Sequence, residues 1–132
     1  MPIHALPFLI SIATPLQADA EPNAHALCDT HADALLGALD EARYDAAIAD
    51  FDAALRARYS AAKLRQDYEA LPASYGKLLG RGRPHTGDIG GHEVVMTPLI
   101  FERGTLTVEV RCDAEGAVSD LRLTPTQVMS KP

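Results

Sequence analysis

Tryptophan is absent from the sequence, and aromatic residues make up only 5% of its 132 residues. Proteins that bind single-stranded nucleic acid stack the bases on aromatic side chains, so this composition argues against such a partner. The formal net charge of -6 argues the same way, because nucleic acid is attracted to basic surfaces. We therefore expect no nucleic-acid partner.

Motifs that identify a reaction or a cofactor are also absent. The sequence has neither a Gly-x-Ser-x-Gly nucleophile elbow nor a Cys-x-x-Cys pair. The glycine and arginine residues of 80–84 lack the strand-to-helix context of a phosphate loop. His85, Asp88 and His92 flank a predicted turn and form the one candidate metal cluster, but exposed turns commonly carry such residues without a ligand. We expect no metal and no cofactor, and we assign no catalytic residue.

No apolar run is long enough to cross a membrane. The run from residue 5 to residue 16 is shorter than the roughly 20 residues of a transmembrane helix, and Pro7 and Pro15 interrupt it. Small residues at Ala18 and Ala20 instead resemble a signal-peptidase site. We expect no transmembrane segment.

The N-terminal segment divides the chain into three parts. Residues 1–20 are predicted to be a signal peptide, residues 21–126 a single α+β domain and residues 127–132 a C-terminal tail. This prediction places the mature protein in the periplasm or outside the cell. The alternative is that the first segment is buried in the fold and the protein is cytoplasmic.

Only two cysteines are present, Cys28 and Cys112. In an oxidising compartment they would form a disulfide that closes a long loop, worth about 4 kcal/mol in the chain-entropy model. In the cytosol they would be two buried thiols. The spacing alone leaves both alternatives open, since it does not give the Cα–Cα distance.

Helical periodicity fills the first half of the domain. Three helices are predicted, from Asn23 as N-cap to about Asp40, over 45–58, and from Ser60 as N-cap to Pro72 or Gly76. The first carries a buried stripe of Leu27, His31, Leu35 and Leu39. Acids dominate residues 19–55 and bases residues 56–83, so neighbouring helices either neutralise one another or present an anion-binding face.

From Gly80 the hydrophobic period changes to two, which predicts an antiparallel meander of three to four strands. Any strand before residue 88 belongs at a sheet edge because of its glycine and proline. A bulge at Thr97 and Pro98 is predicted to shift the phase of the strand 92–102. It would place Val94, Met96, Leu99 and Phe101 on the inner face and Val95 and Ile100 on the outer face.

Helices followed by antiparallel strands indicate an α+β fold, with the helices covering the dry face of a curved sheet. The acid-rich first helices, "FERG" and the "DAEG" turn before a final apolar strand resemble domain of unknown function 3887. The resemblance covers 32–125 and implies the cone-shaped fold of nuclear transport factor 2, in a secreted or membrane-attached protein. It implies no catalytic residues.

His31 is the titratable side chain that the pattern places on the buried face, and Tyr68 on the third helix is its candidate neighbour. The two form the predicted ligand-binding pair. The alternative is a core histidine that is hydrogen-bonded to backbone or to a tyrosine. No acidic partner for a catalytic dyad is found, because Asp52 lies beside the inward stripe of its helix.

Two functional hypotheses of different class follow. The first is a secreted, non-catalytic binding or interaction module of unknown ligand. It would form a homodimer through the outer sheet face, with Val95 and Ile100 at the contact. The second is a small pocket enzyme, of hydrolase, isomerase or dehydratase type, or a small-ligand binder, that uses a cavity near His31 and Tyr68.

Overall fold

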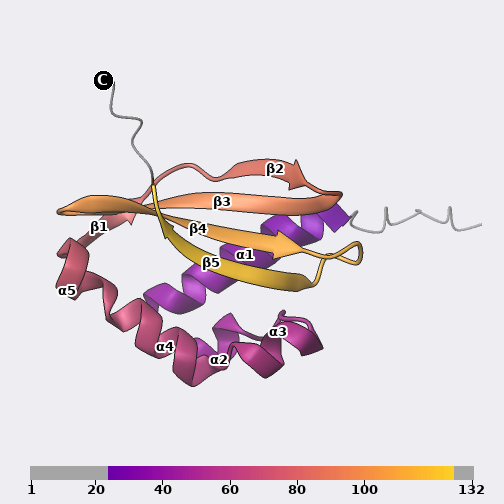
Figure 1. The fold of residues 1–132 in the computed structure, drawn as a ribbon, viewed down its shortest axis with the longest axis horizontal. Helices are drawn as coiled ribbons and strands as arrows, with labels where there is room; N and C mark the ends of the chain where they lie inside the picture. The colour runs from indigo at the N-terminus through magenta and orange to yellow at the C-terminus, as the bar shows by residue number, and fades with distance from the viewer. Residues whose placement is uncertain (1–23, 127–132) are drawn as a thin grey trace, which may run out of the picture.

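The computed structural model describes residues 24–126 (Figure 1), which form an α+β domain with an open antiparallel sheet. The helices are α1 (Ala24–Asp40), α2 (Tyr44–Ala47), α3 (Ala53–Arg58), α4 (Ala61–Glu69) and α5 (Leu71–Tyr75). The strands are β1 (Leu78–Arg81), β2 (His85–Ile89), β3 (His92–Phe101), β4 (Gly104–Cys112) and β5 (Val118–Pro125). The predicted signal peptide, the Asn23 cap and the C-terminal tail lie outside the described residues.

The helical half contains five helices where the sequence predicted three. The predicted helix 45–58 divides because the chain between α2 and α3 pairs with the sheet: Phe51 forms a parallel bridge with Val118. The amide of Asp52 donates to the Val118 carbonyl at 2.8 Å. Asp52 then starts α3 as its N-cap, its side chain accepting from the Leu55 amide at 2.7 Å. Pairing with β5 therefore overrides helix propensity here.

The third predicted helix begins as expected, with the Ser60 hydroxyl accepting from the Lys63 amide at 3.1 Å. It is divided near Pro72, which lies in the first turn of α5. Proline cannot donate an amide hydrogen bond and crowds the preceding turn, so α4 ends at Glu69. Gly76 then takes a positive φ of 78° and leads into β1.

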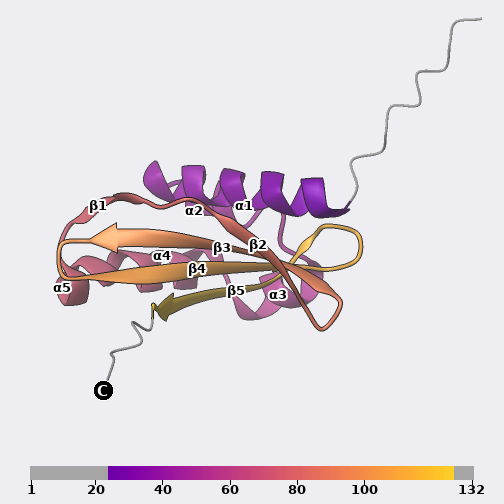
Figure 2. The same ribbon diagram turned by 90° about the horizontal axis from the view of Figure 1, so that it is seen from above.

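The sheet has the order β1-β3-β4-β5, and β2 pairs with β3 on the same edge as β1. The prediction that the strand before residue 88 lies at an edge is thus confirmed, and this edge strand is divided into two. A Gly90–Gly91 turn with two positive φ angles joins β2 to β3, the geometry that a two-residue hairpin favours. The helices lie on one side of the sheet (Figures 1 and 2).

The bulge predicted at Thr97 and Pro98 is wrong. The β3–β4 register runs without a shift from Glu93 opposite Cys112 to Phe101 opposite Gly104. Proline has no amide proton to donate to a neighbouring strand. Pro98 is tolerated because it contacts the β1–β2 edge through its carbonyl, which accepts from the Gly82 amide at 2.9 Å. The strand alternates regularly, so Val95 faces inward and is 3% exposed, whereas Ile100 faces outward and is 41% exposed.

The inner face of the sheet and the helices enclose one apolar core. Its sheet residues are Val95, Leu99, Phe101, Leu106, Val108, Val110, Val118 and Leu121. Helix α1 contributes a stripe centred on Cys28, Ala32, Leu35 and Leu39. His31 lies at the margin of this stripe with its side chain 21% exposed. The observed buried stripe is therefore rotated about the axis of α1, by a fraction of a turn, from the predicted stripe.

The outer face of β4 and β5 carries alternating charges rather than an apolar surface. Arg122 contacts Asp120 at 2.9 Å, Arg111 contacts Glu109 at 3.7 Å, and Arg58 of α3 reaches Asp120 at 3.4 Å. These pairs neutralise one another locally. Within residues 24–126 no helix is long and apolar enough to span a membrane.

Candidate functional site

A disulfide joins Cys28 of α1 to Cys112 at the end of β4. The Cα atoms are 5.9 Å apart, within the range that a disulfide requires, and the sequence separation is 84 residues. Both cysteines are fully buried. Of the two alternatives that the sequence left open, the structure therefore contains the disulfide.

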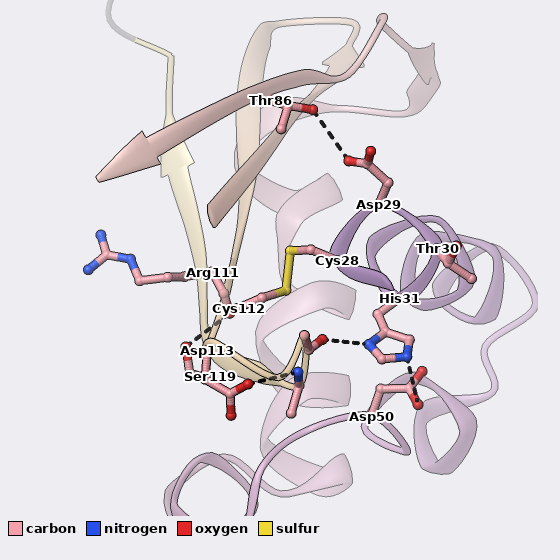
Figure 3. The surroundings of a disulfide bond; sticks show 12 residues. Cys28, Asp29, Thr30, His31, Asp50, Thr86, Arg111, Cys112, Asp113 and Ser119 are labelled. Atoms are coloured by element: carbon pink, nitrogen blue, oxygen red, sulfur yellow. Dashed lines mark hydrogen bonds and ion pairs between the residues drawn. A yellow bond between two sulfur atoms is a disulfide. The ribbon is translucent and has the colours of Figure 1, made fainter. Parts of the chain in front are cut away.

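The first turns of α1 contact three separate parts of the fold. Figure 3 shows Cys28, Asp29 and His31 leaving the same stretch of helix toward Cys112, Thr86 and the chain around Asp50. This spread follows from helical geometry, since neighbouring residues point in directions about 100° apart. One flank of α1 is consequently occupied by structural bonds, whereas the other faces β2.

His31 joins α1 to the turn between β4 and β5 and to the chain between α2 and α3. Its Nδ1 lies 2.8 Å from the Gly116 carbonyl oxygen, which can only accept, so Nδ1 is the donor. Its Nε2 lies 3.6 Å from Oδ1 of Asp50. Both ring nitrogens therefore face acceptors that belong to the protein.

Asp50 is a partner of His31 that the sequence analysis missed. Its backbone carbonyl accepts from the Val118 amide at 2.9 Å, which fixes the chain beside β5. The sequence gives no signal for this approach, because it depends on the break between α2 and α3. The expected glycine turn is confirmed: Gly116 has a φ of 86°, and Asp113 accepts from the amide of Ala117 at 3.0 Å.

Tyr68 belongs to a different neighbourhood. Burial raises its pKa, and Asp40 and Tyr44 raise it further, whereas Arg81 opposes them. Asp40 ends α1, nine residues after His31, or about 13 Å along the helix axis at 1.5 Å per residue. No contact described for residues 24–126 joins Tyr68 to His31, so the predicted pair does not line one site.

A groove lies on the opposite flank of α1, between this helix and the β1–β2 edge of the sheet. Its volume is about 410 Å³. We call it the α1–β2 groove. Its lining consists of Asp29, Ala32, Asp33, Leu36, Arg81, Gly82, Pro84, Thr86, Val95 and Thr97.

Thr97 is the buried polar residue of the α1–β2 groove. It projects from the inner face of β3 beside Val95 and is 4% exposed. Its hydroxyl makes no hydrogen bond with any residue that the structure describes. The oxygen itself is not among the described atoms that are sealed from solvent without a partner, so it opens into the groove and is free to bond a ligand atom.

The two ends of the groove differ in charge. At one end the Arg81 guanidinium is 3.2 Å from Oδ2 of Asp40, so its charge is matched. At the other end Asp29 accepts a long hydrogen bond of 3.3 Å from the Thr86 hydroxyl, and Asp33 has no ion pair with any described residue. The ion pair between Arg81 and Asp40 also joins the basic segment 56–83 to the acidic first helix. It agrees with the prediction that the two oppositely charged segments neutralise one another.

Other hollows in the described surface lack this combination. The depression between α2 and α4 has a volume of about 490 Å³, but its two arginines are already paired. Arg43 contacts Glu41 at 3.3 Å and Arg65 contacts Glu69 at 3.2 Å. His31 lines none of the hollows described for residues 24–126.

No cluster of three or more potential metal ligands occurs among the described residues. Asp88 instead accepts from the Gly91 amide at 3.0 Å and supports the β2–β3 turn.

Comparisons with protein-family models, with curated proteins and with solved structures found no match. The resemblance to domain of unknown function 3887 therefore stays a prediction.

Proposed function

We propose that this protein is a non-catalytic binding module that acts outside the cytoplasm and holds its ligand in the α1–β2 groove. The observation that carries the proposal is Thr97, a residue only 4% exposed whose hydroxyl opens into the groove with no hydrogen-bond partner among residues 24–126. A ligand can bond to this hydroxyl without breaking a described hydrogen bond within the protein. The apolar walls, formed by Ala32, Leu36 and Val95, would contact the rest of such a ligand.

A reaction at His31 is less well supported. A general base needs an imidazole nitrogen directed at the substrate. Here Nδ1 is bonded to the Gly116 carbonyl and Nε2 faces Asp50. The arrangement is suited to joining three segments of the chain, and we propose a structural role for His31.

The location outside the cytoplasm rests on the disulfide. Thiol reductants keep cytosolic cysteines reduced, so a buried structural disulfide is typical of exported proteins. Helices on one side of an open antiparallel sheet also agree with a cone of the nuclear transport factor 2 type. We keep both the export and this family relationship as proposals.

Fragment binding followed by amide chemical shifts tests the proposed site. Small ligands should shift the amides of groove residues such as Leu36, Val95 and Thr97. Asp33→Leu places a larger side chain over the groove from an exposed position of α1 and should abolish the shifts. Ala34→Leu adds the same side chain at an exposed position of α1 and should preserve them. Binding confined to the surroundings of His31, or no binding, would contradict the proposal.

Self-association through the outer sheet face stays a second proposal with a revised contact. Val95 is inside the core, so Val95→Asp would unfold the protein instead of testing a dimer. The exposed large apolar side chains of the described sheet are Ile100, 41% exposed, Leu79, 63% exposed, and Ile89, 45% exposed and opposite His92 on the face of Ile100. If a dimer forms, Ile100→Asp should convert it to a monomer in sedimentation velocity. Ala34→Asp, at an exposed position of α1 on the helical side of the sheet, is the control. A concentration-independent monomer mass for the parent protein would contradict self-association.

A further inference from the structure

We propose that the α1–β2 groove binds an aliphatic primary ammonium group, carried by a free amine or by a lysine side chain. This inference rests on the proposed binding function and names the chemistry of the ligand. It follows from the charges, hydrogen-bonding groups and apolar surface that line the groove.

Two carboxylates stand on the α1 wall. Asp29 and Asp33 are four residues apart, so their side chains lie on the same face of the helix. Both are exposed at residue level and both line the groove. The structure describes no ion pair for either residue, and Asp33 has no described interaction. This end of the groove therefore presents unmatched negative charge.

Arg81, the one cation that lines the groove within residues 24–126, does not neutralise these acids. Arg81 is held by Asp40, whose Oδ2 lies 3.2 Å away, at the C-terminal end of α1. Asp40 is seven residues beyond Asp33, about 10 Å along the axis at 1.5 Å per residue. An anionic ligand would have to displace Asp40 and approach Asp33, whereas a cation would be attracted to the acidic end.

Hydroxyl groups provide the neutral acceptors that an ammonium group requires. An ammonium group donates three hydrogen bonds and accepts none. Thr97 on the floor and Thr86 on the β2 side both line the groove together with Asp33. One carboxylate and two hydroxyls therefore provide one acceptor group for each of the three N–H donors of the ammonium group. The arrangement also gives a hydrogen-bond partner to the Thr97 hydroxyl, which has none among the described residues.

The apolar lining fits an alkyl chain attached to the ammonium group. Ala32 and Leu36 repeat with the helix on the same side as the two acids, and Val95 and Pro84 lie opposite. A methylene chain that contacts these side chains loses water-exposed surface at about 25 cal/mol per Å². The groove therefore favours an amine with an aliphatic chain over a small hydrated cation.

Titration of the intact mature protein with n-pentylamine tests the inference, with 1-pentanol and pentanoate as neutral and anionic probes of similar length. Pentylamine should shift the amides of Leu36, Val95 and Thr97, and raised salt concentration should weaken its binding. Pentanol and pentanoate should bind at least several-fold more weakly.

Matched variants show whether the named groups are responsible. Thr97→Val removes the hydroxyl at nearly constant volume and should raise the Kd for pentylamine about tenfold, whereas Thr97→Ser should preserve binding. Asp33→Asn should raise the Kd about threefold. Asp45→Asn, which removes an exposed acid from α2, should leave the Kd unchanged.

The outcomes separate the two proposals. Binding of pentanol or pentanoate in the groove with the affinity of pentylamine, or no effect of Thr97→Val and Asp33→Asn, would overturn the ammonium inference and leave the groove as a binding site. If no probe or fragment shifted the groove amides, both proposals would fail.

Two further probes identify the source of the ammonium group. These are 1,5-diaminopentane and a capped Ala-Lys-Ala peptide, with norleucine in place of lysine as the control. Tighter binding of the diamine indicates a free amine, and tighter binding of the lysine peptide indicates a protein ligand. Either result agrees with the inference, whereas equal binding of the norleucine peptide would contradict it.

Discussion

The two flanks of α1 differ in how completely their polar groups are used. On one flank Cys28 is bonded to Cys112, and His31 contacts Gly116 and Asp50; we call this the tied flank. On the other flank Asp33 and Thr97 have no described partner and face the α1–β2 groove. The same helix thus presents one side built for stability and one side with free hydrogen-bonding capacity.

This difference separates a structural histidine from a binding site. A histidine beside an aspartate resembles a catalytic pair, but on the tied flank Nδ1 of His31 is hydrogen-bonded to the Gly116 carbonyl and Nε2 faces Asp50. A threonine among apolar residues resembles ordinary core, but in the groove its hydroxyl is unused. The unsatisfied group, rather than the more reactive residue type, indicates where a ligand binds.

Removal of the disulfide should produce the largest change. Cys28→Ser combined with Cys112→Ser frees a loop whose ends are 84 residues apart, which should cost about 4 kcal/mol in the chain-entropy model. For a domain of this size that corresponds to a fall in Tm of roughly 15–30 °C, measurable by circular dichroism. Binding in the groove should persist wherever the variant is folded. A fall of only a few degrees would mean that the tied flank does not depend on the covalent link.

Loss of the His31 contacts should have an intermediate effect. His31→Ala leaves the Gly116 carbonyl without its side-chain donor and should lower the free energy of unfolding by about 1–2 kcal/mol. His31→Gln retains an amide donor and should recover part of that loss. Urea denaturation measures both variants. Unchanged stability in His31→Ala would contradict the structural role and reopen the case for a functional histidine.

A pH-dependent contribution is expected from Asp120, which ties β5 to α3 next to the tied flank. Burial acts to raise the pKa of Asp120, but Arg122, the Leu121 amide and Arg58 outweigh it and hold this pKa below its usual range. A carboxyl group with a lowered pKa in the folded state stabilises the protein above its unfolded pKa. That stabilisation disappears as the pH falls through the folded value.

Asp120→Asn should therefore lower stability by about 1 kcal/mol at pH 7. The difference from the parent protein should shrink progressively as the pH falls below about 4, through the lowered pKa of Asp120. Thermal unfolding between pH 2 and pH 7 measures this dependence, and Glu115→Gln, at an exposed turn position, is the control. A difference that stayed constant with pH would show that the carboxylate charge is not responsible.

The smallest effect on stability is expected on the groove side. Asp33→Asn removes an exposed carboxylate that has no described ion pair and should change the free energy of unfolding by less than about 0.5 kcal/mol. Urea denaturation with the His31→Ala variant in parallel compares the flanks directly. A loss as large as that of His31→Ala would show that Asp33 is structural and that the flanks do not differ.

The sequence determined the order and type of most elements. Period 3.6 before residue 76 and period two from residue 80 predicted helices followed by antiparallel strands. The Ser60 cap and the Gly116 turn were predicted because each depends on a few neighbouring residues. Each of these features is formed by residues within about four positions of one another in the sequence, so the sequence alone is sufficient to predict it.

Long-range pairing decided the rest. The break between α2 and α3 depends on the Phe51–Val118 bridge, and the phase of β3 depends on its register with β4. The contact of His31 with Asp50 and the loss of Tyr68 as its neighbour depend on how helices lie across the sheet. The groove was missed because Asp33 and Thr97 are ordinary residues in sequence, and only packing shows that Thr97 is buried while its hydroxyl stays unpaired.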